Sequence, residues 1–318
     1  MYCCVQNGLA NQNEIRQFIS SLYCDANRLP SHLLTADSET VCIMSANKNM
    51  MAKCTLFENA SYPQYLILGN YECVDNADVS KELFKEIEKI AIAKGKNLLL
   101  GPMNGNTWQA YRFSLLQKKS FLMEQTHQSY YPVQWQASGF DVFAEYHTNI
   151  ETLSKDTEPS QDFFSTKGLQ VRPFDKEHSE RDFKLIYNLS MQSFKYNLFF
   201  APIAWDDFLD LYRGYLSLID EELIDLVFEG EELVGYLFAI ENAFQTDQVI
   251  VKTLARKLDR KYAGMGRALR KRVEAKSVAK GYTTMLHAYI HSKNYSNVLS
   301  RKVGSMLYQK HVLFCKAL

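Results

Sequence analysis

The stretch that decides the fold is VIVKTLARKLDRKYAGMGRAL, residues 249–269. It opens with a β-branched, apolar run typical of a strand and passes through a basic loop to Gly264-Met265-Gly266, where a basic helix to Ala279 is predicted. Glycines at a helix start let backbone N–H groups approach an anion closely, and the helix dipole favours negative charge there. The stretch therefore predicts a site for a diphosphate-sized anion.

The loop also concentrates positive side chains, at Arg256, Lys257, Arg260, Lys261 and Arg267. A dinucleotide-binding loop of the Rossmann type would need a third glycine and a position after the first strand, and the spacing excludes a Walker loop. A glycine turn beside a solvated basic helix face is the plain structural alternative.

The elements on both sides of this stretch give the second half a definite order. Strands are predicted at 169–172, 223–228, 233–241, 248–254, 283–291 and 305–315, and helices at 180–194, 204–218, 264–279 and 294–302. The order is β-α-α-β-β-β-α-β-α-β. The first half repeats a similar order more weakly, with strands at 40–44, 51–57, 65–71, 97–100 and 142–146 and helices at 14–23 and 80–94, which indicates an internal structural repeat.

Length and composition fit two packed domains. At 318 residues, with 47% hydrophobic and 23% charged residues, we expect a domain at 1–150, a polar linker at 151–167 that contains Pro159, and a domain at 168–318. Lys plus Arg and Asp plus Glu are both 36, and this balance argues against nucleic acid as a partner.

The seven cysteines have no C-x-x-C spacing and are interpreted as free thiols rather than a metal or disulfide framework. They are Cys3, Cys4, Cys24, Cys42, Cys54, Cys73 and Cys315. No charged-then-apolar leader opens the sequence and no apolar run of about eighteen residues occurs, so we expect a cytoplasmic location without membrane contact.

The segment Lys261-Tyr-Ala-Gly264-Met-Gly266, between a long strand and an amphipathic helix, resembles the acyl-CoA pyrophosphate motif of the GNAT superfamily, with Lys261 in the place of Arg or Gln. The resemblance covers the second half. It implies an α/β (α+β) protein of two tandem GNAT-like domains, each a mixed, mostly antiparallel sheet flanked by helices. It also implies acetyl-CoA or another acyl-CoA as cofactor. The implied cofactor-binding residues are Leu254, Ala255, Arg256, Lys261, Tyr262, Ala263, Gly264, Met265, Gly266, Arg267, Asn294 and Asn297.

The catalytic end departs from the family pattern. Family members usually have a Tyr that protonates the departing thiolate, and here the matching segment, residues 300–305, carries Ser300 in that place. The analogous segment of the first half carries Trp135, and the strand 65–71 leads into no basic glycine loop. We therefore interpret the first half as a degenerate GNAT-like domain without a CoA loop.

Four side chains are candidates for the general acid or general base. His287 follows the predicted CoA helix, and imidazole is a side chain suited to acid–base catalysis, although a hydrogen-bonded core histidine is an equal interpretation. Glu241 is a candidate base, or an exposed hairpin carboxylate. Tyr308 is a candidate proton donor, or a packing residue, and Ser300 is a weak acid that can hydrogen-bond the sulfur.

Two aromatic segments are candidates for the acceptor site. Residues 193–203 join two helices and contribute Phe194, Tyr196, Phe199 and Phe200, either to an acceptor wall or to a hydrophobic staple. A helix predicted to begin at Thr107 would place Trp108, Tyr111 and Arg112 on one face, either for a carboxylate or for domain packing.

These features together predict an acyl-CoA-dependent N-acyltransferase, acting on a small-molecule or peptide amine by direct aminolysis of the thioester. We expect a monomer or homodimer, no metal, and no nucleic-acid or membrane partner. Two alternatives are a non-catalytic acyl-CoA-binding or interaction protein, and an aminoacyltransferase of the Fem type. The neutral overall charge disfavours the Fem type, because that function needs a basic tRNA-binding surface.

Overall fold

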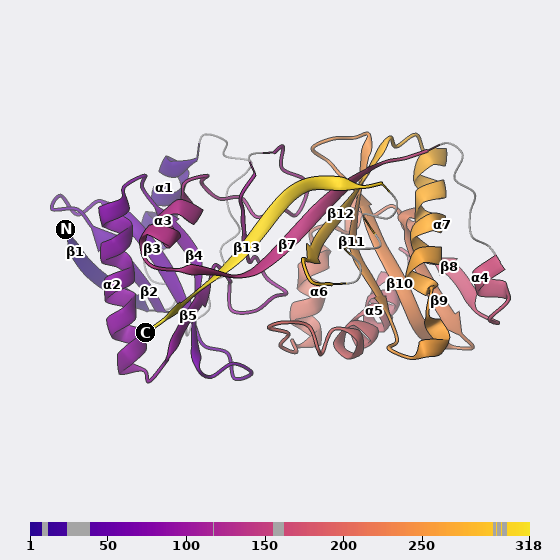
Figure 1. The fold of residues 1–318 in the computed structure, drawn as a ribbon, viewed down its shortest axis with the longest axis horizontal. Helices are drawn as coiled ribbons and strands as arrows, with labels where there is room; N and C mark the ends of the chain where they lie inside the picture. Colours follow the sequence, from indigo (N-terminus) through magenta and orange to yellow (C-terminus); the bar gives the residue numbers. More distant parts are fainter. Residues whose placement is uncertain are drawn as a thin grey trace. The chain divides into compact units, whose positions relative to one another are not determined.

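The computed structural model describes residues 1–7, 12–23, 39–116, 118–154, 162–294, 297, 300 and 304–318. The chain divides into two compact units, which are treated separately below (Figure 1). Unit one comprises Met1–Gln117, Glu124–Glu145 and Lys310–Leu318, and unit two comprises Lys118–Met123 and Tyr146–Gln309.

Unit one contains a mixed sheet with strand order β1-β2-β3-β4-β5-β13, and β6 pairs with β13. Among its described strands only β4 and β5 are parallel, and α2 connects them. The elements are β1 (Tyr2–Asn7), α1 (Gln12–Leu22), β2 (Glu39–Met44), β3 (Met50–Phe57), β4 (Tyr65–Cys73), α2 (Ala77–Ala93), β5 (Leu98–Gly101), β6 (Phe113–Ser114), α3 (Tyr131–Ala137) and β13 (Met306–Ala317).

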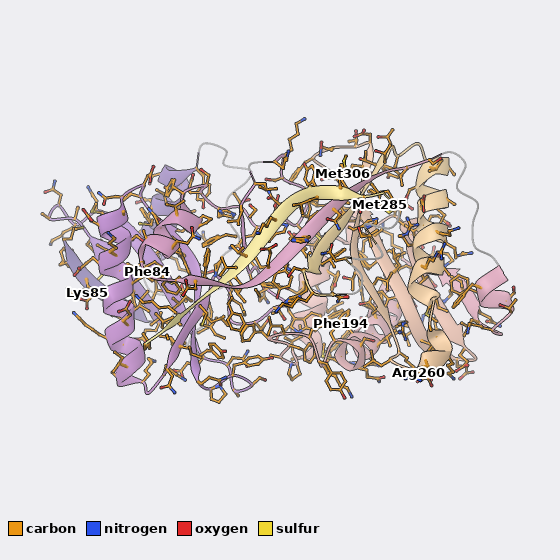
Figure 2. All side chains as sticks on the ribbon, in the orientation of Figure 1. Phe84, Lys85, Phe194, Arg260, Met285 and Met306 are labelled. Atoms are coloured by element: carbon orange, nitrogen blue, oxygen red, sulfur yellow. The ribbon has the colours of Figure 1, made fainter. Side chains whose placement is uncertain are left out.

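The core of unit one lies between α2, α3 and the sheet. Phe84 of α2 is buried there with Tyr71, Trp135 and Phe140, whereas its neighbour Lys85 is exposed. Figure 2 shows these two side chains of α2 pointing in different directions, as the helical period requires. The apolar positions of α2 recur at helical spacing, so packing of this face specifies the helix.

Unit two has the strand order β7-β12-β11-β10-β9-β8. Its elements are β7 (Asp141–Thr152), α4 (Asp162–Ser165), β8 (Gln170–Pro173), α5 (Ser179–Ser193), α6 (Trp205–Arg213), η2 (Leu216–Leu218), η3 (Glu221–Leu223), β9 (Ile224–Glu229), β10 (Glu232–Glu241), β11 (Gln248–Arg256), η4 (Arg260–Tyr262), α7 (Met265–Ala279) and β12 (Thr284–His291). Within the described part of this unit only β11 and β12 are parallel, and α7 connects them.

Helices cover both faces of the unit-two sheet. On one face α7 packs against Leu237 and Val249, and a Cβ added at Gly235 would lie 2.2 Å from the sulfur of Met265. A glycine in β10 is therefore required for α7 to approach so closely. Tyr236, the neighbour of Gly235 on β10, points to the opposite face, because adjacent strand residues alternate between the two sides. There its hydroxyl lies 2.7 Å from the hydroxyl of Ser190 on α5.

The two units are not consecutive halves of the chain. The pairing of β7 with β12 runs from Tyr146 to Thr152, and Phe314 of β13 pairs with Gly101 of β5. The chain thus enters unit two along β7 and returns to unit one along β13. The expected domains, 1–150 and 168–318, differ from these units at both ends.

Three local predictions differ from the structure. Within the expected linker, Glu151 and Thr152 belong to β7 and Asp162–Ser165 forms α4, while residues 155–161 lie outside the described part. The helix predicted at 204–218 ends at Arg213 and is followed by η2. The strand β1 was not predicted, since its sequence YCCVQN lacks a regular alternation.

Other features concern the protein's surroundings. Among the described residues no helix is both long and apolar enough to cross a bilayer, and no cluster of three His, Cys, Asp or Glu side chains suits a metal ion. Cys42, Cys54 and Cys73 are buried free thiols, and Cys3, Cys4 and Cys315 are free and partly buried. Cys24 lies outside the described residues.

Candidate functional site

The centre of the candidate site is the place where β11 and β12 separate. The two strands pair in parallel from Gln248 with Thr284 to Val251 with His287. Beyond this point β11 continues to Arg256 along β10, while β12 continues along β7. The edge of β11 from residue 252 to 256 is thus without a neighbouring strand among the described residues. Its backbone groups can hydrogen-bond an extended ligand arm.

A β-bulge lies at this strand divergence. Phe238 of β10 pairs with Thr253, and the next residue, Ala239, pairs with Val251, so Lys252 is the extra residue on β11. Its ammonium nitrogen lies 4.4 Å from the ring centre of Tyr212 on α6 and 6.0 Å from that of Phe238. Burial lowers the pKa of Lys252 to about 7. Lys252 therefore stands on the face of the sheet that α5 and α6 cover.

The N-terminus of α7 lies on the other face. Gly264 precedes the helix with φ of +91°, a left-handed conformation that glycine adopts without strain, and no side chain caps the first turn. A Cβ on Gly264 would lie 3.0 Å from the ring of Phe163, and one on Gly266 would lie 3.1 Å from Leu254. The first-turn N–H groups are therefore available to an anion, and both glycines also permit close packing.

The basic loop before α7 is partly neutralised. Lys261 is ion-paired with Glu229 at 2.7 Å, and this carboxylate raises the pKa of Lys261 above its ordinary value. Glu229 also accepts a hydrogen bond from Tyr262, and Lys257 pairs with Glu232. Of the expected positive groups, Arg260 and Arg267 have no ion pair among the described residues.

The remaining loop residues are placed as follows. Arg256 donates to the carbonyls of Lys257 and Asp259, so its guanidinium shapes the loop. Figure 2 marks Arg260, near the start of α7. Ala263 connects η4 to α7, and Ala255 of β11 is buried opposite Tyr236. Arg260 of the loop and Arg267 of α7 thus lie beside an uncapped helix start, without an ion pair in the part of the chain that the structure describes.

A buried polar chain leads from α7 to Ser300. Arg270 of α7 lies 3.0 Å from both oxygens of Glu151 and 2.8 Å from Glu274. Glu151 lies 3.0 Å from Nε2 of His287, off the direction of a well-aligned hydrogen bond. Nδ1 of His287 lies 2.7 Å from Oγ of Ser300. We call these residues the polar chain; it joins two predicted candidates, His287 and Ser300.

The polar chain continues through amides. Asn149 of β7 donates to Ser300 and to the side-chain oxygen of Asn297, each at 3.1 Å. Asn297, expected to bind the cofactor, is 5% exposed and lies 2.9 Å from Nδ1 of His147. Asn294 donates its backbone N–H to His291 in a turn. In this arrangement Asn297 orders the buried amides beside Ser300.

The other two catalytic candidates lie elsewhere. Tyr308 donates its hydroxyl hydrogen to the carbonyl of Lys119 at 2.6 Å. Glu241 ends β10 opposite Val249, on the side of Val251 away from the strand divergence, and accepts from Tyr282 at 3.4 Å. The structure thus brings together His287 and Ser300 but not Glu241.

The predicted acceptor wall, residues 193–203, joins α5 to α6 on the same face as Lys252. Phe199 is buried with φ of +55°, Phe200 is partly buried, and Tyr196 is 77% exposed. Phe194 caps α5, and Figure 2 labels it at the end of that helix. The segment therefore supplies both packing residues and an exposed aromatic ring.

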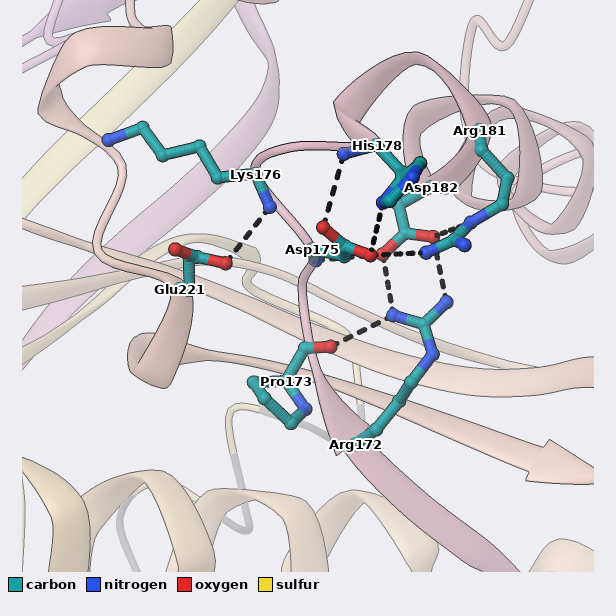
Figure 3. Close-up of polar contacts among 8 residues, drawn as sticks. All are labelled: Arg172, Pro173, Asp175, Lys176, His178, Arg181, Asp182 and Glu221. Carbon is teal, nitrogen blue, oxygen red and sulfur yellow. Dashed lines mark hydrogen bonds and ion pairs between the residues drawn. The ribbon is translucent and has the colours of Figure 1, made fainter.

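An ionic cluster fixes the first turn of α5, at the opposite end of the helix from this wall (Figure 3). Asp182 of α5 is buried and accepts from both terminal nitrogens of Arg172 at 2.6 and 2.7 Å and from Arg181 at 3.0 Å. Burial alone would raise the pKa of Asp182, but these bonds lower it overall. The cluster positions α5 rather than reacting, because its carboxylate is fully engaged.

The second aromatic segment belongs to unit one, and the predicted helix there is wrong. Met103 bridges Tyr111, and Arg112 donates its N–H to Pro102 with φ of +82°, which no helix tolerates. The backbone folds back on itself instead. The Arg112 guanidinium stacks 3.7 Å from the Tyr111 ring centre, and Trp108 is held in an Asn106 turn.

Lys252 was missed by sequence reasoning. The available signal was a single charged residue inside the apolar strand segment VIVKTLA, where a lysine is seldom buried. Its position in a bulge, and the aromatic rings around it, depend on tertiary pairing with β10 and α6.

Comparison with known proteins is informative only at the level of structure. No family model and no curated protein matches the sequence. The fold is similar to a GCN5-related N-acetyltransferase from Sphaerobacter thermophilus, with 14% identity over 87% of this chain and 80% of that one, TM-score 0.52. It is also similar to a tandem GNAT protein from the clavulanic acid biosynthesis pathway, with 9% identity, 99% and 98% coverage, and TM-score 0.56.

A third similar structure is the glucosamine N-acetyltransferase region of a fungal multi-domain GH3 β-N-acetylglucosaminidase, with 9% identity and TM-score 0.59. This chain spans 38% of that protein, which covers 99% of this chain. These likenesses establish the fold. The fold class predicted from the sequence, two GNAT-like folds in tandem with largely antiparallel sheets flanked by helices, is confirmed.

Proposed function

We propose that unit two binds an acyl-CoA, with acetyl-CoA as the first candidate, and transfers its acyl group to an amine. One observation carries the proposal: the strand divergence opens beside a helix N-terminus whose first-turn N–H groups have no capping side chain. Helix N-termini with glycine are suited to phosphate groups. The GNAT fold supports the same general class of activity.

The residues around α7 fit a diphosphate. A Cβ at Gly264 would press against the ring of Phe163, and one at Gly266 against Leu254, so the glycines allow the helix start to sit close to both neighbours while its N–H groups keep no side-chain cap. Arg260 and Arg267 supply positive charge for the diphosphate, whereas the positive charge of Lys261 is already neutralised by Glu229. The free backbone edge of β11, around Leu254 and Ala255, would hold the pantetheine arm.

Once bound, an acyl-CoA supplies an activated thioester carbonyl. On the leaving-group side we assign Ser300 as the hydrogen-bond donor to the departing sulfur. A serine hydroxyl alone is a weak acid, but the His287 ring nitrogen 2.7 Å away is placed to relay a proton to it. Glu151, 3.0 Å from the other ring nitrogen, holds the ring in this position. Ser300 and His287 thus replace the single tyrosine usual in this family.

The test of cofactor binding is calorimetric titration with acetyl-CoA. We expect one site per chain, and a loss of affinity of more than about 100-fold in Gly264→Glu, because the carboxylate repels phosphate at the helix start. Gly281→Glu is the matched control, since Gly281 follows the other end of α7 with φ of +90° and open space around it. Equal binding by both variants, or no binding by the wild type, would contradict the proposal.

A second candidate function is acyl-CoA binding without catalysis, which the replacement of the family tyrosine by Ser300 favours. The two functions separate in an assay of free thiol release from acetyl-CoA over a panel of amines. Because one similar structure is named for a glucosamine N-acetyltransferase region, the panel includes hexosamines beside amino acids, peptides and polyamines. Binding without amine-dependent thiol release would favour the non-catalytic function.

A further inference from the structure

We infer that Lys252 is the general base that deprotonates the acceptor amine, an inference that rests on the proposed acyl transfer. Its position is set by the bulge in β11, directly after the last parallel pair, Val251 with His287. The proposed donor arm lies along the next residues of the same strand. Lys252 is therefore the first side chain that a thioester held at the strand divergence would meet on the α5–α6 face.

The surroundings of Lys252 favour the neutral form of its amine. Neighbouring aromatic rings come from Tyr212 of α6 and Phe238 of β10, and Tyr236 of β10 lies on the same face. The titratable groups among these are the two tyrosines, whose pKa values are themselves raised by burial. No carboxylate pairs with Lys252 among the described residues. Desolvation by burial therefore acts without a compensating negative charge, and the pKa of Lys252 falls to about 7.

The side chain is also accessible. Lys252 is neither fully buried nor exposed, and the acceptor wall of residues 193–203 joins the two helices on its face of the sheet. Ser193, the first residue of that wall, donates to the carbonyl of Arg256, four positions along β11. The first residue of the wall thus contacts β11, the strand that contains Lys252.

The proton balance is complete. The acceptor ammonium gives one proton to neutral Lys252, which later releases it to solvent. The free amine attacks the carbonyl carbon, a C–N bond forms and the C–S bond breaks. Lys252, having released the first proton to solvent, takes the second proton of the nitrogen and releases it too. The departing sulfur gains one proton from Ser300, which takes it from the His287 ring, and the ring recovers a proton from solvent. One proton is released overall. A base with a pKa near the working pH is the most effective for this step, and lysines lowered to about 7 serve in this way.

The first test measures the titration of Lys252 without reference to activity. Trace labelling of the full-length protein with N-hydroxysuccinimidyl acetate, read by mass spectrometry, reports the neutral fraction of each lysine against pH. We expect Lys252 to reach half of its maximal reactivity near pH 7 and then to level off. An ordinary lysine titrates near 10.4 and continues to rise. A midpoint near 10 for Lys252 would overturn the inference.

The second test follows the pH dependence of turnover with acetyl-CoA and the best amine of the panel. We expect Lys252→Met and Lys252→Arg to lower kcat about 100-fold at pH 7.5, because neither side chain accepts a proton. The loss of kcat relative to the wild type should become smaller towards pH 9.5, where the acceptor amine loses its proton without a base. Lys184→Met is the matched control, since Lys184 lies at the same 4.4 Å over the ring of Trp205 but on the exposed side of α5.

The result distinguishes the inference from the function on which it rests. Acetyl-CoA affinity should change less than about threefold in the Lys252 variants, because the phosphate site lies on the other face of the sheet. A higher acceptor KM with unchanged kcat at every pH would make Lys252 an anchor for an acidic acceptor, and would overturn the assignment as base. Failure of the wild type to bind acetyl-CoA would instead overturn the proposed function.

Discussion

Unit one and unit two each have a parallel strand pair, β4 with β5 and β11 with β12. The two pairs are connected in the same way but differ in what lies beside the point where the strands separate. Each pair is connected by a long helix, α2 or α7, and each separates after a few parallel residues. Each also has an irregular register on the strand before the helix. The shared scaffold therefore does not decide which unit can accept a ligand.

In unit one the chain itself fills the divergence. The N–H of Met103 donates to Leu68, and the side chain of Asn104 accepts from the N–H of Asn70. Both filling residues are at most 2% exposed. In unit two the corresponding edge of β11 keeps its backbone groups without a strand partner among the described residues.

The N-termini of α2 and α7 also differ in whether their backbone groups are already satisfied by the chain. Asn76 caps α2 by accepting from the N–H groups of Asp78 and Val79, and Asp78 adds a negative charge to the first turn. At α7 the equivalent place has Gly264 and no capping side chain. Satisfying a helix start with its own side chain removes an anion site, so the difference between the units lies in a few residues rather than in the fold.

The largest expected effect comes from giving α7 the acidic first turn of α2. In Gly266→Asp a carboxylate occupies the second helical position, as Asp78 does in α2. Two charges about 4 Å apart at an effective dielectric constant of about 20 repel by about 4 kcal/mol, so acetyl-CoA affinity should fall about 1,000-fold. Calorimetric titration measures it, with Gly266→Ala as the uncharged control. Similar losses in both variants would indicate a steric effect and refute the electrostatic account.

Next in size is the contrast between two cations that lie beside buried carboxylates, Arg270 in unit two and Lys53 in unit one. Arg270→Met would remove the guanidinium that pairs with both Glu151 and Glu274, each less than 10% exposed, and should cost about 3 kcal/mol of unfolding free energy. Lys53→Met in unit one should cost only about 1 kcal/mol. Glu72 keeps hydrogen bonds from Tyr23 and Tyr131 there, and burial already lowers the pKa of Lys53.

Urea unfolding measures both losses, and hydrogen exchange by mass spectrometry assigns each loss to α7 or to β3. Equal costs in the two variants would show that the tyrosine hydrogen bonds give Glu72 no advantage. A greater cost for Lys53→Met would reverse the expected ranking of the two units.

The smallest effect tests the cap of α2. Asn76→Ala should lower the unfolding free energy by about 1 kcal/mol, because two N–H groups lose their acceptor. Asn76→Asp retains an acceptor and serves as the control. Acetyl-CoA should still bind at one site per chain in calorimetry, since Met103 and Asn104 continue to fill the divergence. A second acetyl-CoA site in Asn76→Ala would show that the cap alone prevents binding by unit one.

The sequence predicted local features better than those that depend on distant partners. The strand, basic loop and helix around Gly264 follow from residues within one continuous segment, and the structure has them in that order. The pairing of Lys261 with Glu229 and the placing of Lys252 over Tyr212 join residues more than thirty positions apart. No period or motif of the sequence specifies such contacts.

The failed helix at residues 107–112 has a similar cause. Capping and spacing favour a helix after Thr107, but the backbone finds its hydrogen bonds in the pairing of Met103 with Tyr111 and in Leu68 of β4. The fold of unit one overrides the local preference. The proposed base was missed for the same reason, because only the bulge directs Lys252 towards α6.

The position of β13 at the end of the sequence has a consequence for folding during synthesis on the ribosome. Unit one cannot complete its sheet until residues 310–318 have been made, because Phe314 and Cys315 pair with Gly101 and Leu100 of β5. At about 5–20 residues per second, the nascent β5 would wait about 10–40 s for its partner while unit two is still being synthesised. During that interval the unpaired backbone of β5 is a docking edge for other nascent chains or for a chaperone. Translation speed through unit two would therefore set how long this edge is exposed.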